Sequence, residues 1–230
     1  MKLLHLPNDF SVPTPTPSPD GVPPPEIVAR SNVRIFLDIE GVVMNFTLPA
    51  ASALDDLEIP VSSSGTIEPN PVYHFTSDEI LYDICHGFEF YAEACPVYPW
   101  TDVLFEEVFK MSMGNVYFLG KQNKWDRGAW GGKAQWIWEK FGDYGYTHLL
   151  MVSEKHMLPF QEILRPHHIL IDNDMENIRA WCQAGGTGYW WPELDPRADL
   201  QVTSMELGRR LRELRRYVDT LVDRLLYGEM

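Results

Sequence analysis

Residues 34–46, which read RIFLDIEGVVMNF, carry the pattern on which the fold prediction rests. The apolar start is typical of a buried strand in a parallel sheet, and α/β proteins place their chemistry in the turn after the carboxyl end of such a strand. Asp38 stands at that end, and Gly41 allows the backbone to turn close to a ligand. Because a single aspartate in this place also fits an ordinary helix cap, the interpretation depends on the rest of the chain.

A regular alternation of strand-like and helical segments follows. Strands are predicted at residues 33–37, 115–119, 149–152, 168–171 and 188–191. Helices are predicted at residues 101–113, 133–141, 157–164 and 175–184. Strands that alternate with helices form right-handed βαβ crossovers and a parallel sheet covered by helices. The predicted fold class is therefore α/β, with a Rossmann-like parallel sheet flanked by helices.

Three segments outside this alternation define the predicted domains. Residues 1–30 hold eight of the chain's 18 prolines, which lack backbone donors, so this segment is expected to be a Pro-rich flexible arm. Turn-forming residues interrupt the pattern within residues 47–96, which indicates an insert that covers the end of the first strand as a small cap. The α/β core is predicted to span residues 31–198, and residues 199–230 are predicted to form a C-terminal helix.

Charge and composition limit the classes of partner. A formal net charge of −14 argues against a surface for nucleic-acid polymers or anionic membranes, but it leaves room for a small anionic substrate. No apolar run approaches the roughly 20 residues of a membrane span. The apolar stretch at the N-terminus, within residues 1–7, is too short for a signal peptide. The three cysteines form no CxxC pair, which suits a reducing compartment. We therefore expect a soluble cytoplasmic protein.

The C-terminal helix has an apolar repeat that allows two interpretations. Its apolar residues recur in alternating steps of four and three, which is a 3.5-residue period. They are Leu207, Leu211, Leu214, Val218, Leu221 and Leu225. The helix packs against the chain's own sheet in one interpretation, and it forms a short coiled-coil seam with a second copy, giving a homodimer, in the other.

Acids, amides and lysines stand directly after the predicted strands. They are Asp38 and Glu40 after the first strand, residues 120–123 after the second, residues 153–155 after the third and residues 172–174 after the fourth. The carboxyl ends of parallel strands meet at one edge of the sheet, so these side chains are expected to lie together. Carboxylate and amide oxygens without histidine or thiolate suit Mg²⁺, and a neighbouring lysine suits a phosphate. A helix cap and a surface lysine are the ordinary alternatives for these residues.

Two motifs and the segment between them resemble the haloacid dehalogenase (HAD) superfamily. Residues 36–43 (FLDIEGVV) resemble its first motif, a strand that ends in D-x-D-G-V. Residues 169–178 (ILIDNDMENI) resemble its fourth motif in the form seen in 5'(3')-deoxyribonucleotidase-like members. Residues 117–142 look like the second strand and following helix of that subgroup. The resemblance covers residues 33–192 and implies a HAD core with residues 47–96 as a divergent cap.

The resemblance implies a catalytic and metal-binding set. By its position in the first motif, Asp38 is the nucleophile and a Mg²⁺ ligand. Glu40 stands in the acid/base position, and its backbone carbonyl is a further metal ligand. The metal-binding acids of the fourth motif fall on Asp172 and Asn173.

The resemblance also implies a set that holds the substrate phosphate. Lys155 fits the family's phosphate-binding lysine, and the resemblance implies that it is also a catalytic residue. Lys133 is the second candidate for the phosphate-binding lysine. Gly120 stands where the family carries a threonine or serine hydroxyl, and Lys121 follows it. The implied substrate is a small phosphomonoester, with a nucleoside monophosphate as the first choice.

The chain departs from the family pattern at three site positions. Glu40 replaces an aspartate, Gly120 replaces a hydroxyl residue and Asn173 replaces an acid. Two functions follow from this mixture of retained and altered residues. The first is a Mg²⁺-dependent phosphatase that works through a phosphoaspartate. The second is a catalytically weak or inactive HAD-like protein that binds a phosphorylated ligand or a protein partner.

Overall fold

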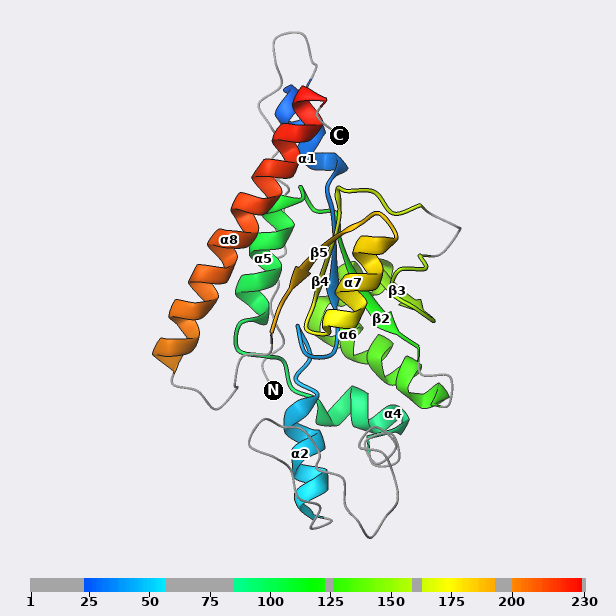
Figure 1. Cartoon of the computed structure of the whole chain (residues 1–230). Coiled ribbons are helices and arrows are strands. Elements are labelled where there is room, and N and C mark those ends of the chain that lie inside the picture. The colour runs from blue at the N-terminus through cyan, green and yellow to red at the C-terminus, as the bar shows by residue number, and fades with distance from the viewer. Residues whose placement is uncertain (1–22, 57–84, 123–125, 159–162, 193–199, 229–230) are drawn as a thin grey trace.

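A five-stranded parallel sheet forms the centre of the computed structural model, which describes residues 23–56, 85–122, 126–158, 163–192 and 200–228. The spatial order of the strands is β3-β2-β1-β4-β5 (Figure 1). Their bounds are Arg34–Asp38 for β1, Val116–Lys121 for β2, Leu149–Val152 for β3, His168–Asp172 for β4 and Thr187–Trp190 for β5. All four strand pairs are parallel, so the predicted α/β fold with a Rossmann-like parallel sheet is confirmed.

Helices occupy most of the remaining described chain. They are α1 (Pro25–Asn32), α2 (Thr47–Asp56), α4 (Gly87–Glu89), the π-helix η1 (Phe90–Ala94), α5 (Thr101–Met111), α6 (Arg127–Thr147), α7 (Met175–Gln183) and α8 (Leu200–Tyr227). None of the helices in this part of the chain is long and apolar enough to cross a bilayer.

Alternating side chains of the strands point to two different helical layers, as expected for a pleated strand. Ile35 and Leu37 of β1 belong to the larger core, which α5, α6 and α8 cover on one face of the sheet. Phe36 belongs to the smaller core on the other face, where Trp181 of α7 lies 5.0 Å from it between ring centroids. Because Asp38 is two residues after Phe36, its side chain is on the same face as α7.

The described helices of the insert lie beyond the carboxyl ends of the strands. Figure 1 shows α2 and α4 at this end and α1 at the opposite end of the sheet. The segment α4–η1 packs directly on α6, and two glycines of α6 allow this close approach. A Cβ atom on Gly128 would come within 2.8 Å of the Phe88 nitrogen, and one on Gly132 would come within 2.5 Å of the Phe88 carbonyl oxygen.

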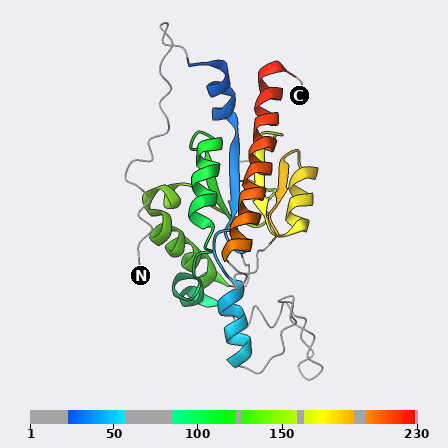
Figure 2. The ribbon, with the colours of Figure 1, turned by 90° about the vertical axis from the view of Figure 1, so that its left-hand side faces the viewer.

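Helix α8 packs on the chain's own core. Figures 1 and 2 show it running along the molecule beside α5. Leu211, Leu214, Val218 and Leu221 are buried in the larger core, and Leu207 and Leu225 pack against it. Arg30 of α1 also pairs with Asp219 of α8 at 2.7 Å. The repeat is therefore used within the chain, and its apolar residues give no support to a homodimer seam.

Several boundaries differ from the prediction. Residues 25–30, expected in the flexible arm, belong to α1, whose Ala29 is buried in the core; residues 1–22 lie outside the described residues. Helix α6 begins at Arg127 and continues to Thr147, with a kink at Gly142 (φ 59°) where we expected it to end. Residues 159–162 of the helix expected over 157–164 also lie outside the described residues.

Candidate active site

Asp38, Lys155 and Asp172 form a buried charge cluster at the carboxyl ends of β1 and β4. Lys155 Nζ lies 2.5 Å from Asp38 Oδ1 and 2.7 Å from Asp172 Oδ2. All three side chains are at most 5% exposed. We expected residues that follow the first, third and fourth strands to lie together at this edge of the sheet. The structure brings Asp38, Lys155 and Asp172 together there.

The sheet register positions the two acids. Leu37 of β1 is paired with Ile171 of β4, so Asp38 and Asp172, the next residues, end adjacent strands on the same face. Lys155 reaches them from the turn that follows β3. Asp174 is the residue that caps α7, since its side chain accepts a hydrogen bond from the Glu176 nitrogen. The capping alternative therefore applies to Asp174 and leaves Asp172 to the cluster.

The cluster places two carboxylates and one ammonium group away from water. Burial raises the pKa of Asp38 well above its ordinary value, and the charge of Asp172 adds to this shift while Lys155 opposes it. Burial alone would lower the pKa of Lys155, but the charges of Asp38 and Asp172 outweigh it and raise that pKa. The Asp38 carboxyl group also accepts a hydrogen bond from the Ile39 nitrogen at 2.7 Å. One lysine thus balances two acids, and the cluster carries an excess of negative charge when both acids are ionised.

Glu40 is paired with Lys133, the second lysine candidate. Lys133 Nζ lies 2.7 Å from Glu40 Oε2 and 4.8 Å from the centroid of the Tyr91 ring. The Lys133 side chain is 3% exposed and that of Glu40 is 28% exposed. The structure therefore separates the two lysines: Lys155 joins the buried acids, and Lys133 links α6 and the cap to the turn after β1. The sequence contained no spacing that would have predicted this pair.

Gly120 and Lys121, which we expected to follow the second strand, are the last two residues of β2. Gly120 is inside β2, where an added Cβ atom would lie 2.5 Å from Met151 Sδ and 3.0 Å from Ile39 Cδ1. It is therefore covered by neighbouring side chains. Lys121 is half exposed and pairs with Glu154 at 2.9 Å, at the end of the neighbouring strand.

Asn173 lies directly against the turn after β1. Gly41 has a φ of 84°, and a Cβ atom there would come within 2.1 Å of Asn173 Nδ2. Glycine is required for both reasons, since an L side chain would be strained and would collide with the amide. Gly41 thus allows the loop after β4 to approach the loop after β1, whereas the sequence had suggested an approach of the backbone to a ligand at this glycine.

The cap aromatics are divided between packing and exposure. Phe90 and Tyr91 pack against Phe46, with ring centroids 5.5 Å and 6.1 Å apart. These rings pack against the larger core of the molecule. Phe88 remains 41% exposed. Tyr73, Phe75 and Tyr82, the other aromatic residues of the insert, lie outside the described residues.

Comparisons with known proteins add little to this geometry. No family model matches the chain, and no curated protein matches it. Among solved structures, the chain is similar to a phosphonoacetaldehyde hydrolase-like protein from Oleispira antarctica, with 13% sequence identity and a TM-score of 0.46. The match covers 86% of this chain and 95% of the other. A TM-score below 0.5 is too low to support an assignment of family or function, so the functional inference depends on the site itself.

Proposed function

We propose that this protein is a HAD-like phosphoric monoester hydrolase that acts on a small phosphomonoester through a phosphoaspartate on Asp38. The observation that carries the proposal is the position of Lys155 between Asp38 and Asp172 at the carboxyl edge of the sheet. This edge is where α/β proteins bind ligands. The HAD-like motifs around Asp38 and Asp172 support the same function independently.

The energetics of the cluster also favour a functional role. Removing three charged groups from water costs several kcal/mol each, and a buried ion pair often stabilises a fold no better than apolar packing. A cluster with two acids and one base is less favourable still. Titratable groups with shifted pKa values at a ligand-binding edge are typical of active sites.

The proposed chemistry is a two-step phosphoryl transfer. A carboxylate oxygen of Asp38 attacks phosphorus, the ester oxygen leaves with a proton, and water then cleaves the acyl-phosphate to release inorganic phosphate. Lys155 offsets the negative charge that the phosphate brings to the two acids. Glu40 occupies the position of the proton donor, but one of its oxygens already accepts a hydrogen bond from Lys133. Proton delivery by Glu40 therefore requires that this pair opens.

The donor atoms at the site fit Mg²⁺. The described residues contain no group of three or more His, Cys, Asp or Glu side chains suited to a metal, so a zinc-type cage is not found among them. Mg²⁺ needs less from the protein, since one or two carboxylates together with substrate phosphate and water usually hold it. Asp38, Asp172, Asn173 and the Glu40 carbonyl would hold the ion, which when bound would neutralise charge on the phosphate.

The surroundings of two site residues favour a second function, which is ligand binding with weak or no catalysis. Glu40 is engaged with Lys133, and Gly120 offers no hydroxyl and is covered by Met151. Both features remove groups that the family uses during turnover. The buried Asp38–Lys155–Asp172 cluster would then retain a phosphorylated ligand without cleaving it.

A phosphate-release assay with matched variants separates the two functions. The purified protein, Asp38→Asn and Asp143→Asn are incubated with Mg²⁺ and a panel of nucleoside monophosphates and sugar phosphates. Asp143 is an exposed acid of α6, so its variant makes the same charge change away from the cluster. We expect release by the wild type and Asp143→Asn, and a loss of about 10³-fold or more in Asp38→Asn, because that variant lacks the nucleophile.

The other outcomes are equally informative. Equal release by all three proteins would show that the activity does not come from Asp38. No release by any of them, together with saturable binding of the same phosphomonoesters in calorimetry, would support the binding function in place of the hydrolase. If the hydrolase is weak because of Glu40, then Glu40→Asp should raise the turnover number.

A further inference from the structure

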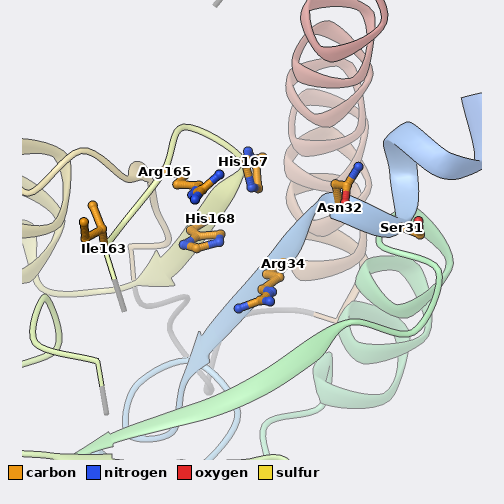
Figure 3. Close-up of a pocket in the computed structure, with 7 residues that line it drawn as sticks. All are labelled: Ser31, Asn32, Arg34, Ile163, Arg165, His167 and His168. Carbon is orange, nitrogen blue, oxygen red and sulfur yellow. The ribbon is translucent and has the colours of Figure 1, made fainter. Parts of the chain in front are cut away.

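A polar cavity lies at the opposite end of the sheet from Asp38. Its volume is about 460 Å³, which is within the range of small-molecule sites. Figure 3 shows the residues that line it, from the end of α1, the start of β1 and the segment leading into β4. They are Ser31, Asn32, Arg34, Ile163, Arg165, His167 and His168.

The lining of this cavity is basic. Arg34 is the register partner of His168, so the first residues of β1 and β4 present their side chains on the same face. Arg165 and His167 come from the segment just before β4, and none of the residues that line the cavity is acidic. This concentration of basic groups contrasts with a formal net charge of −14 for the chain.

His168 is a buried polar group of this cavity that lacks a partner. His168 is only 2% exposed. Its Nδ1 atom, like that of His167, has no hydrogen-bond partner among the described residues. Burial, together with the positive charges of His167, Arg34 and Arg165, lowers the pKa of His168 to about 4. Burying an unpaired polar atom costs free energy, and such a group usually has a water or ligand partner.

The basic cavity and the acidic cluster occupy opposite ends of the same two strands. Arg34, Phe36 and Asp38 alternate along one face of β1, and His168 and Asp172 take the corresponding places on β4. Asp38 is four positions after Arg34, which corresponds to about 13 Å along a strand. Phe36 and Leu170 of the smaller core fill the space between them. The cavity is therefore a separate place on the molecule and not an extension of the Asp38 site.

We propose that this cavity binds a small polyanion, with phosphate groups as the chemistry that its two arginines fit best. A guanidinium group matches phosphate geometry with two parallel hydrogen bonds, and Arg34 and Arg165 approach the cavity from different segments. Ser31 and Asn32 at the end of α1 complete the polar lining, and both of their side chains donate hydrogen bonds to the Val28 carbonyl oxygen. An anion could also accept a hydrogen bond from the N–H group of a neutral histidine ring. This proposal does not depend on the hydrolase function.

Inorganic pyrophosphate is a suitable probe, titrated calorimetrically into the full chain with EDTA present. Arg165→Gln is the test variant, because Arg165 is exposed and its loss should leave the fold intact. The matched control is Arg179→Gln, which removes the same charge from an exposed position of α7 that does not line the cavity. We expect saturable binding by the wild type, at least about 10-fold weaker binding by Arg165→Gln, and little change in Arg179→Gln.

Nitrogen NMR of the histidine rings locates the bound anion. The ring signals of His167 and His168, identified with a His167→Gln variant, should shift on addition of pyrophosphate. Three results would overturn the proposal: no saturable binding at millimolar pyrophosphate, equal weakening by the two arginine variants, or binding that leaves both ring signals unmoved.

Discussion

At the scale of single residues, the candidate site consists of a few charged side chains, most of them buried, that pair with one another. Within the described part of the chain, Lys155 is the one lysine that contacts both Asp38 and Asp172, and Lys133 pairs with Glu40. Residues that serve catalysis are often retained at a cost to stability. The raised pKa of Asp38 indicates such a cost, because burial and Asp172 oppose its ionised form.

Replacing Asp38 by asparagine should therefore stabilise the protein at neutral pH. A carboxyl group whose pKa is raised on folding contributes stability below its unfolded pKa of about 3.9, and that contribution is lost as the pH rises through the folded pKa. Relative to Asp38→Asn, the wild type should become less stable over this range. At pH 7 we expect the free energy of unfolding of Asp38→Asn to exceed that of the wild type by about 0.5–2 kcal/mol.

Urea unfolding at several pH values between 4 and 8 measures this difference. Asp143→Asn is again the control, and its free energy of unfolding should follow that of the wild type within about 0.5 kcal/mol at each pH. The opposite trend, in which Asp38→Asn becomes relatively less stable as the pH rises, would mean that Lys155 holds Asp38 in its ionised form more strongly than burial opposes it.

At the scale of elements, two adjacent glycines of α6 differ in how closely the α4–η1 segment approaches them. Gly132 precedes Lys133, the partner of Glu40, and lets Phe88 and Tyr91 approach the α6 backbone. Gly131, its neighbour in the same helix, is in looser surroundings, with the nearest atom 3.4 Å from an added Cβ. Two adjacent glycines thus differ in whether a side chain fits.

Alanine substitutions at these glycines should act in opposite directions. Gly131→Ala removes glycine from a helix interior and should gain up to about 1 kcal/mol. Gly132→Ala makes the same propensity gain but places a Cβ within 2.5 Å of the Phe88 oxygen and 2.9 Å of Tyr91 Cβ, so we expect a net loss of about 1–3 kcal/mol. Equal effects of the two variants in urea unfolding would contradict the close packing of α4 and η1 on α6.

At the scale of the whole molecule, α8 is part of the main core. Its buried leucines and valines continue the apolar layer that α5 and α6 form over one face of the sheet. Arg215 of α8 also pairs with Glu107 of α5. The helix therefore contributes to the stability of a single chain, whatever other copies are present.

Truncation at the centre of α8 tests this role. Leu214 is fully buried, so Leu214→Ala should lower the free energy of unfolding by about 2–5 kcal/mol. Met205→Ala, on the same helix but 71% exposed, should change it by less than about 0.5 kcal/mol. The loss in Leu214→Ala should be independent of protein concentration. A loss that grows on dilution would instead indicate that the leucines support association of two copies.

Much of the fold could be predicted from local pattern, while pairings between distant segments could not. The strand ending in Asp38 and the strand ending in Asp172 were predicted from apolar runs, because burial on both faces produces such runs. The family resemblance left Lys133 and Lys155 as alternatives, since both stand near the start of a predicted helix. Only the register of the sheet and the position of α6 show that Lys155 meets the acids and Lys133 meets Glu40.

The basic cavity was missed for a related reason. Arg34 and His168 are 134 positions apart and carry no motif, so nothing in the sequence associates them. They become neighbours because β1 and β4 are adjacent and parallel, which brings the first residues of both strands together. The signal that could have pointed to it was the run of basic residues in 165–168, read together with the arginine that opens the first strand.

The sequence by itself determined that the chain forms a parallel α/β sheet with acids and lysines at the carboxyl ends of its strands. These features depend on apolar runs and turn residues that are close in the chain. The tertiary structure decided which charge neutralises which, that the apolar repeat of α8 is buried within the chain, and that Asp38 and the basic cavity lie at opposite ends of one face. Such features depend on strand order and on contacts between distant residues, which local propensity does not encode.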